Sequence, residues 1–347
     1  TEFPFFTFLY ADPHAHMFAL PITLLALLWG LSIVMGRWHW RRDEGTPGWL
    51  NFALSFSIGA VIIGALRPTN TWDLPAYLGL TLLAVVYTAF RYGEVPERLL
   101  PGLSSGARRG LLAAGAAAML AGLAILFYQP FGQWYGQGYN AVDLWKGDRS
   151  AFWSYITHWG VFLFIIIGWL IKETRDWLAS TPLSSLNKLR PYQTAILVAL
   201  IVVLVIIAFL LTQGVQIAWF TLPLALWAGV LVFRPTQPDV KRFVLVLVTA
   251  ALLLTLAVEV IVLRGDIERM NTVFKFYLQA WTMLSVSAAA ALFWLLPGVG
   301  YWPSGRRMVW QIALILLVFG AALYPVMAGS DKINDRMSEA APHTLDG

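Results

Sequence analysis

The stretch YQTAILVALIVVLVIIAFLLT, residues 192–212, decides the fold class of this chain. It has the length of a helix that crosses a membrane, about 20 residues, and it contains no charged side chain. The rest of the chain has the same character, because 59% of its 347 residues are hydrophobic and only 12% are charged. Soluble globular domains carry roughly 25% charged residues. We therefore expect an all-α polytopic membrane protein that is embedded in the lipid bilayer.

Further apolar stretches of similar length predict about ten transmembrane helices in total. The expected spans are 17–36, 50–66, 74–91, 108–128, 153–171, 192–212, 215–233, 241–263, 278–296 and 308–327. No low-complexity linker or compelling internal repeat divides them, so we expect a single transmembrane domain over residues 1–347. The span 192–212 predicts a helix that faces lipid.

The loops between these spans alternate in charge, and this alternation predicts the orientation. One set of loops carries 16 of the 24 Lys and Arg residues. It comprises residues 36–45, 91–109, 172–190, 234–242 and 297–307. The positive-inside rule assigns this set to the cytoplasm. The same rule explains the formal net charge of +5, so basic character gives no reason to expect a nucleic-acid partner. The remaining loops then face outward, and we expect a multi-pass protein of the plasma membrane with an extracytoplasmic functional face.

The first outer segment contains the stretch LYADPHAHMFALP, residues 9–21, with one acid and two histidines close together. Asp12 and Pro13 have the residue types preferred at a helix N-cap and first turn, which explains them structurally. Neither His14 nor His16 is explained in this way. Together with Asp12 they could hold a divalent metal ion or form an acid–base pair, although two histidines and one acid are an unspecific ligand set.

The second outer motif is RPTNTWDLPAY, residues 67–77. Asp73 could cap the next span, with Pro75 in its first turn. Arg67 could simply extend its charge from the end of a span into the interface. An Arg beside a helix N-terminus is equally suited to bind a phosphate group.

The third outer motif, RGDIERMNTVFKFYLQAW, covers residues 264–281 and is the densest polar cluster beside a span. An interfacial aromatic belt with internal ion pairs accounts for part of it. Lys275 lies against an apolar span, where a cation is costly without a partner, and a lipid phosphate would be a natural one. Glu259 is expected inside the span 241–263, about one turn from its end, with Arg264 close enough in sequence to neutralise it.

Several function classes have no support in the sequence. The chain has no cysteine, which excludes disulfides and thiolate metal sites. It contains no Gly-rich phosphate loop, no Ser–His–Asp signature and no His-Glu-x-x-His motif.

Three stretches resemble one known family: EFPFFTFLYADPHAHMFALP (2–21), RPTNTWDLPAY (67–77) and ERMNTVFKFYLQAW (268–281). They are similar to the signature stretches of the Chlor_Arch_YYY family of uncharacterised polytopic membrane proteins. That family in turn resembles the GT-C superfamily of glycosyltransferases. These enzymes move a sugar from a polyprenyl-phosphate carrier to an acceptor on the outer side of the membrane. The resemblance implies a GT-C-like fold and a polyprenyl-phosphate-linked sugar as partner.

The resemblance also implies roles for individual residues. GT-C enzymes place a catalytic acid in the first outer loop, which makes Asp12 the preferred catalytic residue and Glu2 the second choice. Arg67, Arg269 and Lys275 would hold the lipid-linked phosphate. The full substrate-binding set that we expect is Arg67, Asn70, Asp73, Glu268, Arg269, Asn271, Lys275 and Tyr277. The resemblance implies that a helix or helices upstream of residue 1 and an extracytoplasmic part beyond residue 347 belong to the natural chain.

Two other functions stay open at this point. The chain could be a non-catalytic structural or accessory subunit of a larger membrane complex, bound to other membrane subunits. A transporter is a third possibility, but its polar residues are expected in mid-membrane, whereas those of this chain gather at one face.

Overall fold

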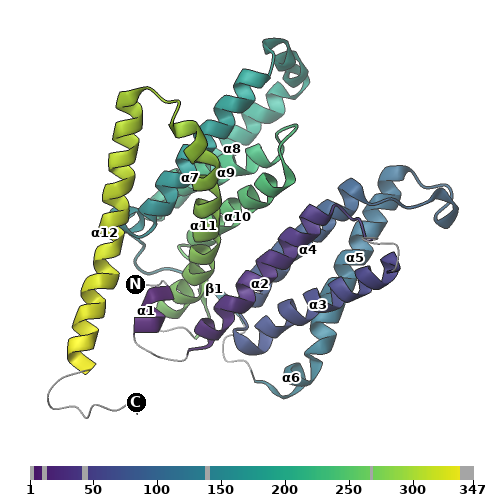
Figure 1. The fold of residues 1–347 in the computed structure, drawn as a ribbon, viewed down its shortest axis with the longest axis horizontal. Coiled ribbons are helices and arrows are strands. Elements are labelled where there is room, and N and C mark those ends of the chain that lie inside the picture. Colours follow the sequence, from purple (N-terminus) through teal and green to yellow (C-terminus); the bar gives the residue numbers. More distant parts are fainter. Residues whose placement is uncertain (1–3, 10–13, 41–45, 137–140, 266–268, 337–347) are drawn as a thin grey trace. The chain divides into compact units, whose positions relative to one another are not determined.

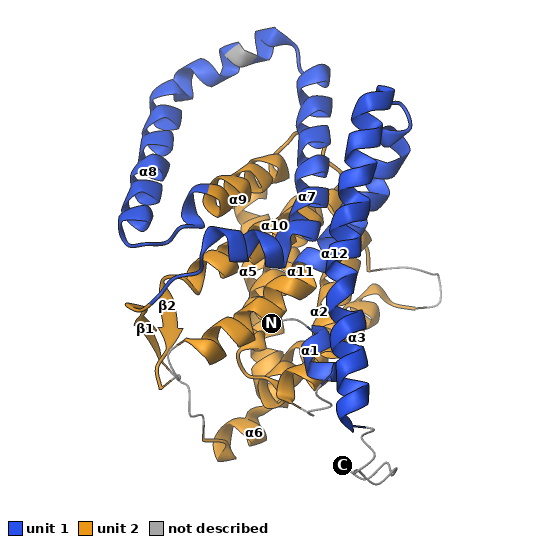
Figure 2. Cartoon of the chain, turned by 90° about the vertical axis from the view of Figure 1, so that its left-hand side faces the viewer, with its two compact units in different colours: residues 1–13, 148–219, 284–347 blue, residues 14–147, 220–283 orange. Residues whose placement is uncertain are grey.

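The computed structural model describes residues 4–9, 14–40, 46–136, 141–265 and 269–336 (Figure 1). The chain divides into two compact units, which Figure 2 shows in different colours. Unit 1 comprises residues 1–13, 148–219 and 284–347, and unit 2 comprises residues 14–147 and 220–283. The prediction of a single transmembrane domain stays a prediction.

Unit 2 is built mainly from long apolar helices. They are α2 (Ala15–Gly36), α3 (Gly48–Thr69), α4 (Asp73–Tyr92), α5 (Ser105–Phe127), α10 (Asp239–Ala257) and the first part of α11 (Met270–Val299). Shorter elements are η1 (Glu97–Leu99), α6 (Gln129–Trp134) and most of α9 (Ala218–Val232). Helices α2 to α5 pack against one another, and α10 packs on α2 and α4.

Small residues allow the helices of unit 2 to approach closely. A Cβ atom on Gly59 of α3 would lie 2.3 Å from the Trp29 ring of α2. A Cβ atom on Gly64 would lie 2.6 Å from the Ala124 carbonyl oxygen of α5. Such contacts are typical of membrane helices, which gain van der Waals packing from each other because lipid is as apolar as their side chains.

A short antiparallel pair of strands joins two loops of unit 2. Strand β1 (Val142–Leu144) pairs with β2 (Ile261–Leu263), with Val142 opposite Leu263. The expected span 241–263 is therefore too long, because α10 ends at Ala257 and the chain turns before β2. The β-branched residues Val260, Ile261 and Val262 favour an extended strand over a continued helix.

Unit 1 contains two helices of about 30 residues that pack against each other, α7 (Phe152–Ser180) and α12 (Ser304–Arg336). It also contains α1 (Pro4–Leu9), η2 (Leu183–Tyr192), α8 (Gln193–Thr212) and the last part of α11. Helix α8 is the stretch that opened the sequence analysis. It has no buried residue, as expected for a helix that faces lipid.

The prediction of an all-α polytopic membrane protein is confirmed. Among the described residues, nine helices are long and apolar enough to cross a membrane. The tenth expected span, 215–233, is the 15-residue helix α9, which is shorter than a spanning helix. Helices α7, α11 and α12 are longer than expected, because their polar end turns stay helical beyond the apolar window.

Two helix starts differ from their predictions. Helix α2 begins at Ala15 with an extended His14 at its N-cap, which is later than Asp12 and Pro13 predict; Asp12 itself lies outside the described residues. Helix α4 begins at Asp73 itself, with Trp72 at the N-cap. Asp73 therefore lies in the first turn of α4 and not at its N-cap, a position where the helix dipole favours acidic side chains.

Candidate functional site

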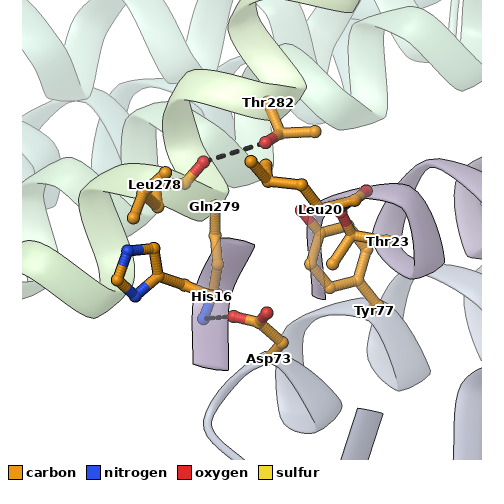
Figure 3. A pocket seen from close by; sticks show the side chains of 8 residues that line it. All are labelled: His16, Leu20, Thr23, Asp73, Tyr77, Leu278, Gln279 and Thr282. Atoms are coloured by element: carbon orange, nitrogen blue, oxygen red, sulfur yellow. Dashed lines mark hydrogen bonds between the residues drawn. The ribbon is translucent and has the colours of Figure 1, made fainter. Parts of the chain in front are cut away.

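Side chains from all three motifs line one small cavity in unit 2. We call this group the motif cluster: His16 and Thr23 from α2, Asp73 and Tyr77 from α4, and Gln279 and Thr282 from α11 (Figure 3). Leu20 and Leu278 complete the lining. The cluster lies where α2, α4 and α11 begin and α3 ends, which we call the motif end of unit 2. Stretches that are about 60 and 200 residues apart in sequence thus form one polar group.

Asp73 and Gln279 form the central hydrogen bond of the motif cluster. The Gln279 Nε2 donates to Asp73 Oδ1 at 2.9 Å (Figure 3). It also donates to the Trp72 carbonyl oxygen at 2.8 Å. Asp73 is only 4% exposed and Gln279 is buried. A buried carboxylate needs such a donor, because removal from water without a partner is costly. The amide therefore holds the start of α4 against α11.

Tyr77 places a hydroxyl group beside two threonines. Thr23 donates its own hydroxyl to the Leu20 carbonyl, and Thr282 donates to the Leu278 carbonyl. Their oxygen atoms keep lone pairs that can accept a hydrogen bond from the Tyr77 hydroxyl. Gln279 Oε1 is buried without a hydrogen-bond partner among the described residues. The cavity of about 10 Å³ has room for at most one water molecule.

The two histidines lie at the start of α2. The His16 ring packs edge-on against the Phe274 ring of α11, with 4.3 Å between the centroids, and lies 5.4 Å from the His14 ring. The described residues contain no group of three or more acids and histidines that could hold a metal ion. His14 and His16 supply two ligands at most, so the expected metal site depends on further ligands and stays a prediction.

Glu259 and Arg269 form a buried ion pair in the turn after α10. Arg269 Nη1 lies 3.0 Å from Glu259 Oε2 and also donates to the Val258 carbonyl oxygen at 3.0 Å. Glu259 is 0% exposed and the Arg269 side chain 13% exposed. The Arg269 guanidinium further lies over the Trp145 ring at 5.8 Å. Glu259 therefore lies outside α10 and not within a span, and its partner is Arg269, not Arg264.

Arg264 pairs instead with Asp143 across the two strands. Its Nε and Nη2 donate to the two carboxylate oxygens at 3.1 and 3.0 Å. These hydrogen bonds hold the pKa of the exposed Asp143 carboxyl below its ordinary value of 3.8. Beside this pair, the Leu263 amide donates to the Thr272 hydroxyl at 2.9 Å. The strands thus connect the loop after α6 to the start of α11.

The remaining predicted binding residues lie near the motif end without joining the cluster. Arg67, half-buried near the end of α3, packs on α6, where a Cβ on Gly132 would lie 2.8 Å from both terminal nitrogens of its guanidinium. The Arg67 side chain makes no hydrogen bond or ion pair with the described part of the chain, and its carbonyl oxygen accepts a hydrogen bond from the Thr71 hydroxyl. Asn70, half-buried after α3, lies outside the cavity lining, but its side chain interacts with the Asp73 carboxyl. The others are half-buried Asn271 and Lys275 on α11, and buried Tyr277 on α11.

The structure therefore brings two predicted site residues together in the motif cluster, His16 and Asp73. Three others, Glu2, Asp12 and Glu268, lie outside the described residues. The cluster also contains polar residues that the sequence analysis missed, namely Thr23, Tyr77, Gln279 and Thr282. Their signal was present as polar side chains inside apolar helices, with Asp73 and Tyr77 four residues apart on one face of α4.

The sequence analysis also missed a carboxylate centre of unit 2 that lies outside the motif cluster. Asp239, at the start of α10, accepts hydrogen bonds from the hydroxyls of Tyr87 (2.5 Å) and Tyr92 (2.6 Å). Arg37 Nε lies 3.4 Å and Arg91 Nε 3.9 Å from its oxygens. This centre joins the ends of α2 and α4 to α10, opposite to where these two helices begin, and its partners saturate the carboxylate.

Comparison with known proteins gives a family but no characterised relative. No curated protein and no solved structure matches the chain. The sequence profile of one family, described as "Uncharacterized membrane protein (DUF2298)", matches residues 1–284. This range includes all three motifs, the motif cluster, and the buried carboxylates of Glu259 and Asp239. The chain belongs to the DUF2298 family of uncharacterised membrane proteins.

Proposed function

We propose that this protein transfers a sugar from a polyprenyl-phosphate donor to an acceptor at the extracytoplasmic side of the plasma membrane. The observation that carries the proposal is the convergence of the three motifs on one polar group at the motif end of unit 2. A scaffold of lipid-facing helices needs no such group, because buried polar side chains are costly in a membrane protein. Those same stretches carry the resemblance to GT-C glycosyltransferases.

The reaction forms one bond and breaks another. The acceptor hydroxyl oxygen attacks the anomeric carbon of the sugar and passes its proton to the Asp12 carboxylate, with Glu2 as the second choice of base. The bond between the anomeric carbon and the phosphate oxygen breaks, and polyprenyl phosphate leaves as an anion. Arg67 and Lys275 would stabilise the charge on that anion. A divalent cation at His14 and His16 would add positive charge for the same purpose.

The geometry of the described residues refines the role of Asp73. Its carboxylate is buried and bound to Gln279, so it has no free face for a sugar. We assign it the task of positioning the loop 67–72, which carries Arg67 and Asn70. Arg269 likewise holds the turn after α10 through Glu259, which leaves Arg67 as the better candidate for a phosphate ligand.

A second function, that of a non-catalytic subunit of a membrane complex, is favoured by the closure of the motif cluster. Its cavity of about 10 Å³ is far smaller than a sugar site, and both Asp73 and Glu259 are satisfied internally. A scaffold that has lost its activity would have this form.

One experiment separates the two functions. The purified chain is reconstituted with radiolabelled hexoses on polyprenyl phosphate, and label transfer to an acceptor extract is measured. Asp12→Asn is expected to reduce transfer by about 100-fold or more. The matched control Asp331→Asn, at an exposed position of α12, should leave transfer unchanged. Undiminished transfer by Asp12→Asn would remove this residue from the mechanism. Absence of transfer in the unmodified chain, together with co-purification of other membrane subunits, would favour the second function.

A further inference from the structure

Unit 1 contains a large cleft that the proposed reaction does not use. It has a volume of about 1090 Å³ and is formed by the end of α7, the end of α11 and the start of α12. We call it the α7–α12 cleft. Its volume lies just above the range of typical small-molecule sites, roughly 300–1,000 Å³. A helix bundle that packed fully against itself would leave no such space.

The mouth of the α7–α12 cleft is basic. Lys172, Arg175 and Arg306 line it, against one acid, Asp176. Lys172 Nζ lies 2.7 Å from Asp176 Oδ2, so these two side chains form an ion pair with each other. Arg175 and Arg306 are exposed and make no hydrogen bond or ion pair with the described part of the chain. Two guanidinium groups therefore remain for an anion, and guanidinium matches phosphate oxygens well.

The interior of the cleft is aromatic and offers one polar group. Trp310 is 9% exposed and packs between Phe164 and Trp302, with both ring-centroid distances at 5.8 Å. Its Nε1 is buried without a hydrogen-bond partner among the described residues. An indole N–H is a donor only, so what it lacks is an acceptor oxygen. About one turn further along α12 the lining is apolar at Ala313, and Val309 beside Trp310 is apolar as well.

These features succeed one another along α12 in the order of a phospholipid. Arg306 and Trp310 are four residues apart, which corresponds to about 6 Å along the helix. The phosphate of a glycerophospholipid is followed first by its ester carbonyls and then by its acyl chains. The phosphate would thus lie at the guanidinium groups and the ester oxygen at the indole N–H. The acyl chains would lie along the apolar lining. Free phosphate would leave the inner two unmatched.

We propose that the α7–α12 cleft binds an anionic glycerophospholipid, with its phosphate at Arg175 and Arg306, an ester carbonyl at Trp310 and its acyl chains along α12. The positive-inside rule predicts that this end of unit 1 faces the cytoplasm, because the basic loops 172–190 and 297–307 lie there. Anionic lipids make the cytoplasmic leaflet negative, so the leaflet at this end of unit 1 contains the proposed ligand. The proposal does not depend on the sugar-transfer function.

The test measures lipid retention by the full chain in detergent. Micelles with phosphatidylglycerol or phosphatidylcholine of identical acyl chains are offered, and bound lipid is counted by native mass spectrometry. We expect phosphatidylglycerol to be retained in preference. The double variant Arg175→Ala/Arg306→Ala should lower its affinity by at least about tenfold, since each charge-assisted hydrogen bond is strong. The control Lys188→Ala/Arg190→Ala removes two exposed charges outside the cleft and should change nothing.

Trp310→Phe provides an independent readout. It keeps the aromatic ring and removes only the N–H donor, so it should lower the affinity for both lipids by about threefold to tenfold. Equal retention of the two lipids by the unmodified chain would overturn the proposal. So would an unchanged affinity in the arginine double variant. Displacement of the lipid by millimolar glycerol phosphate as readily as by lipid would show a site for small anions instead. The comparison of lipids on the unmodified chain decides the matter even where a variant fails to fold.

Discussion

At the scale of single residues, the buried acids of unit 2 determine which contacts matter most. Asp73 and Glu259 each have a strong donor on α11 or in the turn before it, Gln279 and Arg269. A buried acceptor that loses its donor retains the full cost of its desolvation. The partners of these acids should therefore be more sensitive to substitution than any exposed polar residue.

Gln279→Leu tests the hydrogen bond of the motif cluster. The substitution leaves the Asp73 carboxylate and the Trp72 carbonyl without their shared donor, and we expect a loss of about 2 kcal/mol in the free energy of unfolding. The measurement is denaturant unfolding in detergent. The matched control Gln311→Leu changes an exposed glutamine of α12 and should have little effect. Equal losses in both variants would mean that the Asp73–Gln279 hydrogen bond contributes nothing specific.

Glu259→Gln tests the buried ion pair. The change removes the charge that compensates Arg269, and breaking a buried pair in this way costs about 3 kcal/mol or more. Asp143→Asn, in the exposed pair with Arg264, is the comparison and should cost much less, because solvent screens exposed charges. The same unfolding measurement ranks the two. If the exposed pair proved the more costly to break, this assignment of burial would be wrong.

At the scale of elements, glycine positions determine how closely α3 can pack on α5. A Cβ on Gly64 would meet the Tyr128 ring at 2.4 Å and the Ala124 carbonyl oxygen at 2.6 Å. The backbone of α5 would have to move to accept it. Gly79 on α4 has no atom within 4 Å of the same position.

These two glycines give a matched pair of substitutions. Gly64→Ala should lower the free energy of unfolding by about 1–3 kcal/mol through overpacking. Gly79→Ala should be neutral or raise it by up to about 1 kcal/mol, because alanine is the better helix former. Thermal unfolding of the two variants provides the comparison. Similar stabilities for both would contradict the close approach of α3 and α5.

The β1–β2 pair should respond to acid. Arg264 depresses the pKa of Asp143 below 3.8, so the ion pair contributes stability above that value and loses it as pH falls through the depressed pKa. Hydrogen exchange of residues 142–144 and 261–263 should be slower in the unmodified chain than in Asp143→Asn at pH values above 3.8. The difference should vanish in stronger acid. A difference that persists there would show that the strands are held by other contacts.

At the scale of the whole molecule, the orientation in the membrane is open to a direct test. The chain has no cysteine, so single cysteines can be placed without background. Gln213→Cys lies in an exposed turn after α8, on the predicted outer side, and Ser184→Cys lies in the exposed segment before it. An impermeant maleimide applied to intact cells should label only Gln213→Cys. The reverse pattern would invert the predicted orientation and with it the placement of the reaction.

The fold class and most of the spans could be predicted because hydropathy is a property of a single window of sequence. Helix α8 was identified from its composition alone, and its lack of burial agrees with that prediction. The end of α10 could not be predicted in this way, because apart from Glu259 the residues 258–263 are as apolar as the helix before them. The extended backbone of residues 261–263 depends on β1, a strand that lies more than 100 residues earlier.

The candidate site likewise has features that the sequence predicted and features that only the tertiary structure revealed. The sequence by itself determined that the chain is a helical membrane protein and that its unusual polar residues gather in three motifs. Only the tertiary structure decided their pairing: Gln279 with Asp73, Arg269 with Glu259, and Arg264 with Asp143. The physical reason is that hydropathy and helix length are local, whereas the partner of a buried charge is whichever group the packing of distant helices brings within about 3 Å.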